Sequence, residues 1–168
     1  MMANLEIERK FLIRYPDISL LTGLAGVRVL QIVQTYLASK NGETSRVRKI
    51  VSDGVTSYIY TSKIRVTNIT HIENERKITR EEYEELLLQA DSERKPICKT
   101  RYCVPNGKHV AEIDVYDFWN DRATLEIELS SEDEEFEMPD FISVIKEVTD
   151  DRRYKNASLS KSVVYEEL

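Results

Sequence analysis

The chain is poor in residue types that define several protein classes. Its 168 residues include 2 Cys, 2 His, 4 Pro, 5 Gly and 1 Trp. Cys98 and Cys103 share one predicted strand but face opposite sides, so they should not pair. His71 and His109 have no partner at ligand spacing, which argues against a zinc site. No apolar run reaches the roughly 18 residues that a membrane-spanning helix needs, so we expect a cytoplasmic protein.

The N-terminus and the net charge restrict the partners further. Met1-Met2-Ala3-Asn4 leads directly into charged sequence, with no signal-peptide core. The net charge of −6 argues against nucleic-acid binding, which usually needs a basic surface. A locally basic cleft can still attract a small anion, because the field inside a cleft can oppose the net charge. We therefore expect a small anionic ligand, with no nucleic-acid or membrane partner, and the sequence predicts no oligomeric state.

Charged residues spaced two apart are the most informative feature that is present. The stretches are Glu6-Glu8-Lys10, Arg46-Arg48, Lys63-Arg65, Glu73-Glu75, Lys99-Arg101, Glu112-Asp114 and Glu126-Glu128. In a β-strand, residues two apart point to the same face, so each stretch forms a ladder of charge opposite a mostly apolar face. Ladders of both signs in one small protein indicate strands whose charged faces look at one another, around a site for a highly charged ligand.

Eight runs of the sequence have strand character, with short turns between several of them. The runs are residues 4–14, 29–38, 44–51, 55–65, 69–78, 97–104, 109–117 and 123–130. Asn41-Gly42, Asp53-Gly54 and Asn106-Gly107 tolerate the positive φ of tight hairpin turns, which favours antiparallel pairing.

Helical patterns are fewer. A capping box at Thr79-Arg80-Glu81-Glu82 opens a predicted helix over 79–90. Shorter helical segments are predicted near 17–24 and over 150–161, and the acidic run 132–137 is predicted to be a solvated loop.

The charged ladders favour a barrel over a sandwich. A sandwich needs apolar inner faces, whereas a barrel wide enough to hold a ligand can have a polar lumen. We predict a mainly β (α+β) protein: an eight-stranded antiparallel β-barrel that forms a polar tunnel, with a few helices packed outside. Residues 1–168 are predicted to form a single domain. The helices at 79–90 and in the tail are expected to cover outward residues such as Phe11, Ile113 and Leu125.

The two signs of charge suit different parts of a polyphosphate complex. The basic set is Lys10, Arg46, Arg48, Lys63, Arg65, Lys99 and Arg101. Arg binds phosphate oxygens bidentately and Lys adds point charge. The acidic set is Glu6, Glu8, Glu73, Glu75, Glu112, Asp114, Glu126 and Glu128. Clustered carboxylates without Cys or His suit Mg²⁺ or Mn²⁺. The combination predicts metal-assisted chemistry on a polyphosphate.

The opening Glu6-Ile7-Glu8-Arg9-Lys10-Phe11-Leu12 resembles the E-x-E-x-K signature of the CYTH superfamily, the triphosphate tunnel metalloenzymes of bacterial type. The order of the later ladders matches this family too, as do Glu147-Val148-Thr149-Asp150 and Tyr154-Lys155-Asn156 in the tail. The chain departs from it at Arg76-Lys77, where the family often has another acid or an aromatic residue. The family fold, an eight-stranded antiparallel tunnel, agrees with the strand count reached above.

The resemblance implies roles for the ladder residues. The divalent metal would be held by Glu6, Glu8 and Glu128, with Glu126. The triphosphate would be gripped by Lys10, Arg46, Arg48, Lys63, Lys99 and Arg101. Orientation of these cations, or a second metal, would fall to Glu73, Glu75, Glu112 and Asp114. Glu8 and Lys63 are the predicted catalytic residues, and Arg65 is expected at the tunnel mouth.

The implied activity is metal-dependent hydrolysis of a phosphoanhydride bond, with inorganic tripolyphosphate as the favoured substrate. The alternatives within the family are a class IV-type adenylate cyclase, a thiamine triphosphatase or a nucleoside triphosphatase. An alternative of another kind is a non-catalytic polyphosphate-binding module. The sequence leaves open whether a metal-bound hydroxide, a carboxylate or Lys63 with a depressed pKa accepts the proton of the attacking water.

Overall fold

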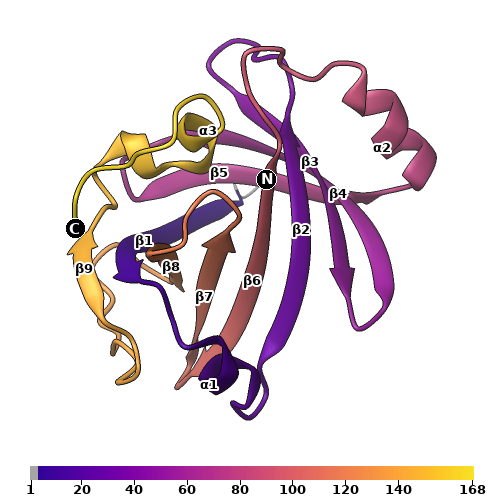
Figure 1. Ribbon diagram of the computed structural model, residues 1–168. Coiled ribbons are helices and arrows are strands. Elements are labelled where there is room, and N and C mark those ends of the chain that lie inside the picture. Colours follow the sequence, from indigo (N-terminus) through magenta and orange to yellow (C-terminus); the bar gives the residue numbers. More distant parts are fainter. Residues whose placement is uncertain (1–3) are drawn as a thin grey trace.

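The computed structural model describes residues 4–168 and is dominated by antiparallel strands (Figure 1). The strands are β1 (Leu5–Arg14), β2 (Arg28–Tyr36), β3 (Thr44–Ser52), β4 (Val55–Arg65), β5 (Thr70–Ile78), β6 (Ile97–Asn106), β7 (His109–Tyr116), β8 (Arg122–Leu129) and β9 (Val144–Glu147). Residues 1–3, on which the expectation about a signal peptide partly depends, lie outside the described range. Within that range no helix is long and apolar enough to cross a membrane.

The helices are short and lie where the sequence predicts them. They are α1 (Ile18–Thr22), α2 (Arg80–Leu87), the 3₁₀ turn η1 (Arg152–Tyr154) and α3 (Asn156–Leu159). The predicted capping box is half formed: the Thr79 hydroxyl accepts the Glu82 N–H at 3.1 Å. Asp17 caps α1 in the same way, because its carboxylate accepts the Leu20 N–H at 3.2 Å.

The first eight strands form a closed antiparallel barrel, which confirms the predicted fold. Their order is β5-β4-β3-β2-β6-β7-β8-β1, and β1 pairs back onto β5. A two-residue hairpin joins β3 to β4, where Asp53 and Gly54 both have positive φ, 49° and 76°. This is the backbone that a two-residue turn between right-handed twisted strands needs.

The barrel closes over a short length only. β1 and β5 pair through Leu5–Ile72, Glu6–His71 and Ile7–Thr70. Further along the same edge of β1, the short strand β9 pairs with residues 11–13. The sequence patterns did not predict β9.

Lys10 lies between these two pairings and is bound by the tail. Its N–H donates to the Thr149 hydroxyl at 3.0 Å, and its carbonyl accepts the Val148 N–H at 2.8 Å. The tail therefore supplies hydrogen-bond partners for the backbone of β1 at a residue where β5 no longer pairs with it.

Thr149→Val is expected to lower the free energy of unfolding by about 1–3 kcal/mol, because the buried Lys10 N–H loses its acceptor. Urea denaturation measures the change. Thr149→Ser, which keeps the hydroxyl, is the matched control and should stay within about 1 kcal/mol of the wild type. A Thr149→Val variant that is as stable as the wild type would show that the hydroxyl contributes nothing.

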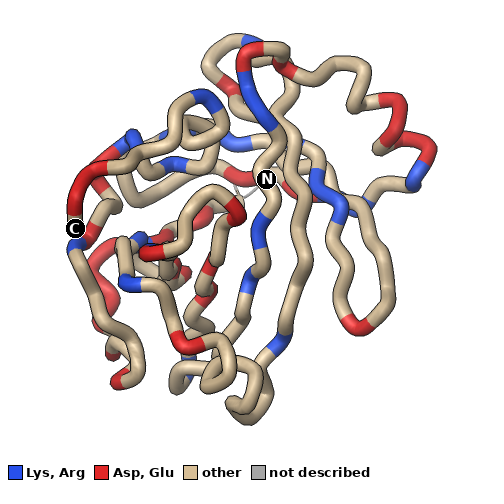
Figure 2. Tube along the Cα trace, in the orientation of Figure 1, with Lys and Arg blue, Asp and Glu red and all other residues tan. Residues whose placement is uncertain are grey.

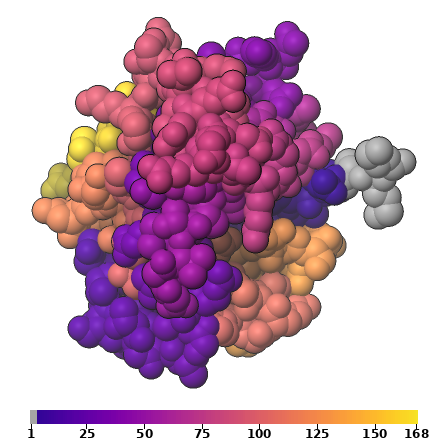
Figure 3. Space-filling view, turned by 90° about the vertical axis from the view of Figure 1, so that its right-hand side faces the viewer, coloured from indigo at the N-terminus to yellow at the C-terminus, as the bar shows by residue number. Residues whose placement is uncertain are grey.

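Apolar side chains cover the outer wall in two separate clusters. On β1, β7 and β8 the outward residues Phe11, Ile113 and Leu125 are buried beneath α1 and residues 136–142. The expectation that the 79–90 helix and the tail cover this wall is therefore wrong. Instead, α2 packs Tyr83 against the outer face of β3–β5, the side that faces the viewer in Figure 3. The acidic run 132–137 is a loop, as predicted, although its Phe136 packs against Phe11.

The tail closes one end of the barrel. Tyr154 and Leu159 pack against Leu12, Tyr116 and Trp119 in a third buried cluster. Leu12 continues the inward-facing row of β1, so this cluster lies where the lumen would otherwise run on. The lumen is therefore polar along the charged ladders and apolar at this end.

Candidate active site

Strand register brings the charged ladders together inside the barrel. Glu8 lies opposite Glu128, and Lys10 lies opposite Glu126, across β1 and β8. Figure 2 shows the basic positions of β6 beside the acidic positions of β7. All predicted site residues except Lys99 and Asp114 line one cavity of about 700 Å³. The ones that line it are Glu6, Glu8, Lys10, Arg46, Arg48, Lys63, Glu73, Glu75, Arg101, Glu112, Glu126 and Glu128.

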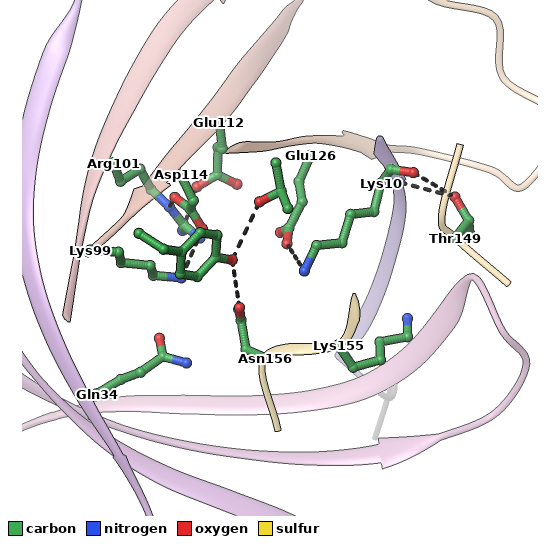
Figure 4. A network of polar contacts seen from close by, with 12 residues as sticks. Lys10, Gln34, Lys99, Arg101, Glu112, Asp114, Glu126, Thr149, Lys155 and Asn156 are labelled. Carbon is green, nitrogen blue, oxygen red and sulfur yellow. Dashed lines mark hydrogen bonds and ion pairs between the residues drawn. The ribbon is translucent and has the colours of Figure 1, made fainter. Parts of the chain in front are cut away.

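Lys99 and Asp114 instead form a buried ion pair inside the barrel that does not line the cavity. Lys99 Nζ lies 2.8 Å from Asp114 Oδ2, and their side chains are 0% and 1% exposed. Arg101 adds two bonds to Asp114, from Nε at 2.7 Å and from Nη2 at 2.9 Å (Figure 4). Burial alone would raise the pKa of Asp114, but Arg101 and Lys99 outweigh it and lower the pKa to about 2. Burial and Arg101 lower the pKa of Lys99 to about 7, despite Asp114.

Several lumen cations already have carboxylate partners. Lys10 Nζ lies 3.2 Å from Glu126 Oε1, and Arg48 Nη2 lies 2.8 Å from Glu75 Oε2. Arg101 Nη1 lies 2.6 Å from Glu112 Oε2. These pairs neutralise buried charges that would otherwise cost several kcal/mol each. They also hold each side chain in one orientation before any ligand arrives.

Lys63 bridges two carboxylates. Its Nζ lies 2.7 Å from Glu6 Oε1 and 3.2 Å from Glu73 Oε2. Burial acts to lower the pKa of Lys63, but Glu8, Glu6 and Glu73 outweigh it and raise the pKa above its usual value. In the metal-free structure these carboxylates favour the ammonium form of Lys63, which does not support a depressed pKa for this residue.

Glu8 and Glu128 have no cation partner among residues 4–168. Burial and the charge of Glu126 raise the pKa of Glu8 well above its usual value. Burial and the charge of Glu6 raise the pKa of Glu128 as well. Lys63 acts to lower both pKa values, but burial and the neighbouring carboxylates outweigh it, so the ionised forms of Glu8 and Glu128 are disfavoured in the described structure.

The carboxylates fit a hard cation in chemistry, although they are not gathered as a finished site. Within the described chain, no three acidic, imidazole or thiol side chains converge closely enough to hold a metal ion. The donors at hand are oxygens, which Mg²⁺ and Mn²⁺ prefer. Glu8 and Glu128 face each other across adjacent strands, and Glu6 is two residues from Glu8 on the same face. We conclude that the donor set fits a divalent metal.

Four cations that line the cavity have no carboxylate partner among the described residues: Arg46, Arg65, Arg152 and Lys155. Arg46 lies on the inward face of β3, and its Nε is buried without a hydrogen-bond partner among residues 4–168. Burial would lower the pKa of Arg46, but the neighbouring Tyr36 outweighs it and raises the pKa. An anion in the lumen can therefore bind Arg46 without breaking an existing ion pair.

The sequence patterns missed part of the cavity lining. The residues concerned are Tyr36, Thr44, Thr61, Asn68, His71, Arg152, Lys155 and Asn156, whereas Arg65 lines the cavity as expected. Tyr36, Thr44 and Thr61 lie on the inward faces of β2, β3 and β4, so strand alternation could have found them.

The residues of the tail gave no such signal. Asn156 accepts the Tyr116 hydroxyl at 2.6 Å, which fixes the start of α3 against the barrel (Figure 4). Lys155 precedes Asn156 and lies below Lys10 and Glu126 in this view. The structure therefore brings a cation into the cavity from outside the barrel strands.

A closed barrel with carboxylates and cations converging in its lumen defines a protein built to bind a charged ligand. The comparisons with known proteins agree. The solved structure of the inorganic triphosphatase NE1496 is 29% identical, with a TM-score of 0.59, over 96% of this chain and 97% of that one.

Two further solved structures share the fold at lower identity. The PH1819 protein from Pyrococcus horikoshii OT3 is 22% identical, with a TM-score of 0.59, over 76% of this chain and 80% of that one. A putative adenylate cyclase (bh2851) from Bacillus halodurans is 15% identical, with a TM-score of 0.55, over 77% of this chain and 83% of that one. No family model and no curated protein matches the chain. The fold and the NE1496 likeness together confirm the resemblance to the CYTH superfamily.

Proposed function

We propose that this chain is a metal-dependent triphosphatase and that inorganic tripolyphosphate is its substrate. The observation that carries the proposal is one cavity in which carboxylates and cations that form no ion pair among the described residues lie together. The likeness to the inorganic triphosphatase NE1496 over nearly the whole chain supports it. The proposal includes a single triphosphate tunnel domain over residues 1–168 and a cytoplasmic location.

Glu8 and Glu128 are the first metal ligands in this proposal, because neither carboxylate forms an ion pair with a cation among the described residues. Glu6 and Glu126 are neighbouring carboxylates, and they form ion pairs with Lys63 and Lys10, respectively. The metal is Mg²⁺ or Mn²⁺, the cations that carboxylate oxygens suit. When bound, such an ion supplies positive charge against phosphate oxygens and the negative charge that develops during hydrolysis.

The basic residues bind the phosphate chain. Arg46 offers a guanidinium with no carboxylate partner, and Arg48 and Arg101 offer the donors that their pairs leave free. Each ion pair fixes its cation in position, so the donors need little rearrangement when phosphate arrives. Water then attacks the terminal phosphorus in line with the departing diphosphate. Lys63 acts as a charged group that holds Glu6 and Glu73.

Arg46→Ala is expected to lower kcat/KM for tripolyphosphate by about 100-fold, because the lumen loses its unpaired guanidinium. Phosphate release under subsaturating substrate measures the effect. The matched control is Arg76→Ala, since Arg76 lies on β5 with an exposed side chain paired to Glu82. A loss no larger than that of the control would remove Arg46 from the substrate site.

A panel of substrates tests the function itself. The protein is incubated with Mg²⁺ or Mn²⁺ and, in turn, with tripolyphosphate, ATP and thiamine triphosphate. Phosphate, diphosphate and cyclic AMP are then measured. We expect metal-dependent release of phosphate and diphosphate from tripolyphosphate at the highest rate. Cyclic AMP from ATP would instead identify a cyclase. Binding of tripolyphosphate without turnover of any compound would identify a binding module.

A further inference from the structure

A second group of ligand-binding side chains lies at the edge of the cavity. It consists of Arg65, Asn68, His71, Arg152 and Lys155, which we call the rim. Arg65 and His71 are directly opposite each other on β4 and β5, with Asn68 in the turn between these strands. Lys155 Nζ donates to the Asn68 carbonyl at 3.4 Å, which brings the tail to the same turn. Two segments far apart in the sequence therefore form one cluster.

The rim differs from the barrel lumen in its charge balance. In the lumen, Lys10, Lys63, Arg48 and Arg101 each have a carboxylate within 3.2 Å. None of the rim cations has such a partner among residues 4–168; the Arg65 side chain bonds the Asn68 amide oxygen. A group of cations without counter-charge at the edge of a cavity attracts an anion.

The rim also contains an unused polar atom. His71 Nδ1 is buried and has no hydrogen-bond partner within the described part of the chain. Buried polar atoms normally have one, so this nitrogen is available to a ligand group or to water. His71 belongs to the same cluster as Arg65, because the register of β4 and β5 places these two residues directly opposite each other.

The chemistry of the rim suits a phosphate rather than an organic group. Stacking of a nucleobase or of a thiazole or pyrimidine ring normally uses a Phe, Tyr or Trp. The rim has none of these, and Tyr36 is the only one among the residues that line the cavity. Guanidinium, ammonium and amide donors are the groups that bind phosphate oxygens.

We propose that the rim binds a fourth phosphate, so that the chain takes linear polyphosphates longer than tripolyphosphate. The inference rests on the proposed function, because it assumes that the lumen holds the first three phosphates. Arg65 and Arg152 contact the additional phosphate from the exposed side of the rim. Lys155 is the rim residue that lies near Lys10 and Glu126 of the lumen, and it contacts both the third and the fourth phosphate.

Titration calorimetry with tripolyphosphate and tetrapolyphosphate, in the presence of a chelator, tests the rim. The wild type is expected to bind tetrapolyphosphate about tenfold more tightly than tripolyphosphate. The double variant Arg65→Ala/Arg152→Ala should lose most of this preference. Both residues are exposed, so the substitutions leave the core intact. The matched control is Lys161→Ala, because Lys161 is an exposed tail lysine, near Glu93, that does not line the cavity. This control should keep the wild-type preference.

Equal affinity of the wild type for the two chains would overturn the rim proposal, as would a double variant that keeps the preference. ATP supplies a further comparison. If the double variant loses ATP affinity relative to tripolyphosphate as much as it loses tetrapolyphosphate affinity, the rim binds a nucleoside and the proposal is overturned. These dissociation constants do not depend on turnover. If the wild type binds both polyphosphates but hydrolyses neither, the proposed hydrolytic function is overturned. The affinities of the two polyphosphates still decide the rim proposal in that case.

Discussion

Glu8→Gln is expected to lower kcat for tripolyphosphate by about 100-fold or more while the barrel stays folded. The amide keeps the shape of the side chain but removes a carboxylate oxygen for the metal at a position that forms no ion pair within residues 4–168. The metal concentration needed for half-maximal activity should rise as well. Phosphate release across a Mg²⁺ or Mn²⁺ titration measures both quantities. Glu81→Gln, on the exposed face of α2, is the control.

The same substitution should not destabilise the metal-free protein. Burial and Glu126 raise the pKa of Glu8, so the folded state disfavours its ionised form. An acid whose pKa is higher in the folded state than in the unfolded state binds its proton more tightly when the protein is folded. Its contribution to stability is therefore complete below the unfolded pKa and is lost as pH rises through the folded pKa. Above the folded pKa, Gln removes the free-energy cost of holding an ionised carboxylate at this buried position. We expect Glu8→Gln to melt at or above the wild-type temperature in chelator at pH 8. A variant that is both fully active and less stable would contradict the assignment of Glu8.

Asp114→Ala is expected to lower the free energy of unfolding by about 3–5 kcal/mol, because two buried cations lose their shared partner. Lys99 would keep no carboxylate within 4.0 Å among the described residues, and Arg101 would keep only Glu112. Urea denaturation followed by circular dichroism measures the loss. Asp140→Ala, at an exposed position, is the matched control and should change little.

This variant also separates two roles for Asp114. The resemblance allowed it either to orient cations or to bind a second metal, whereas the structure pairs it with Lys99 and Arg101 inside the barrel, where it does not line the cavity. At a temperature where both proteins are folded, the metal concentration for half-maximal activity should match that of the wild type. A shift as large as that in Glu8→Gln would show that Asp114 binds metal after all.

Local patterns predicted the barrel well because its strands carry their own signals. Alternation at Glu6-Ile7-Glu8 and the Asp53-Gly54 turn each reflect the conformation of a few residues, which depends little on the rest of the chain. The inward direction of the ladders followed from their charge. That is why the sequence predicted most residues that line the cavity.

The level along the barrel axis at which the cavity ends could not be predicted in this way. Lys99 and Arg101 share one face of β6, yet only Arg101 reaches the cavity. Alternation says which face a residue occupies but does not say whether apolar residues close the lumen at that level. Here Tyr116 and Trp119 do so, together with the tail.

The tail itself was the least predictable part. β9 has four residues, and its pairing with β1 joins segments more than a hundred residues apart. Lys155 reaches the cavity because Asn156 and Thr149 bind the barrel, and those are long-range contacts. A weak helical pattern over 150–161 contains no information about them.

A crystal structure of the protein soaked with Mn²⁺ and tripolyphosphate tests the central claim most directly. The account predicts anomalous density for manganese between Glu8 and Glu128, with phosphate oxygens on Arg46 in the same lumen. Manganese and phosphate bound only on the outer surface, with the lumen filled by water and the Glu8 and Glu128 carboxylates free, would contradict it.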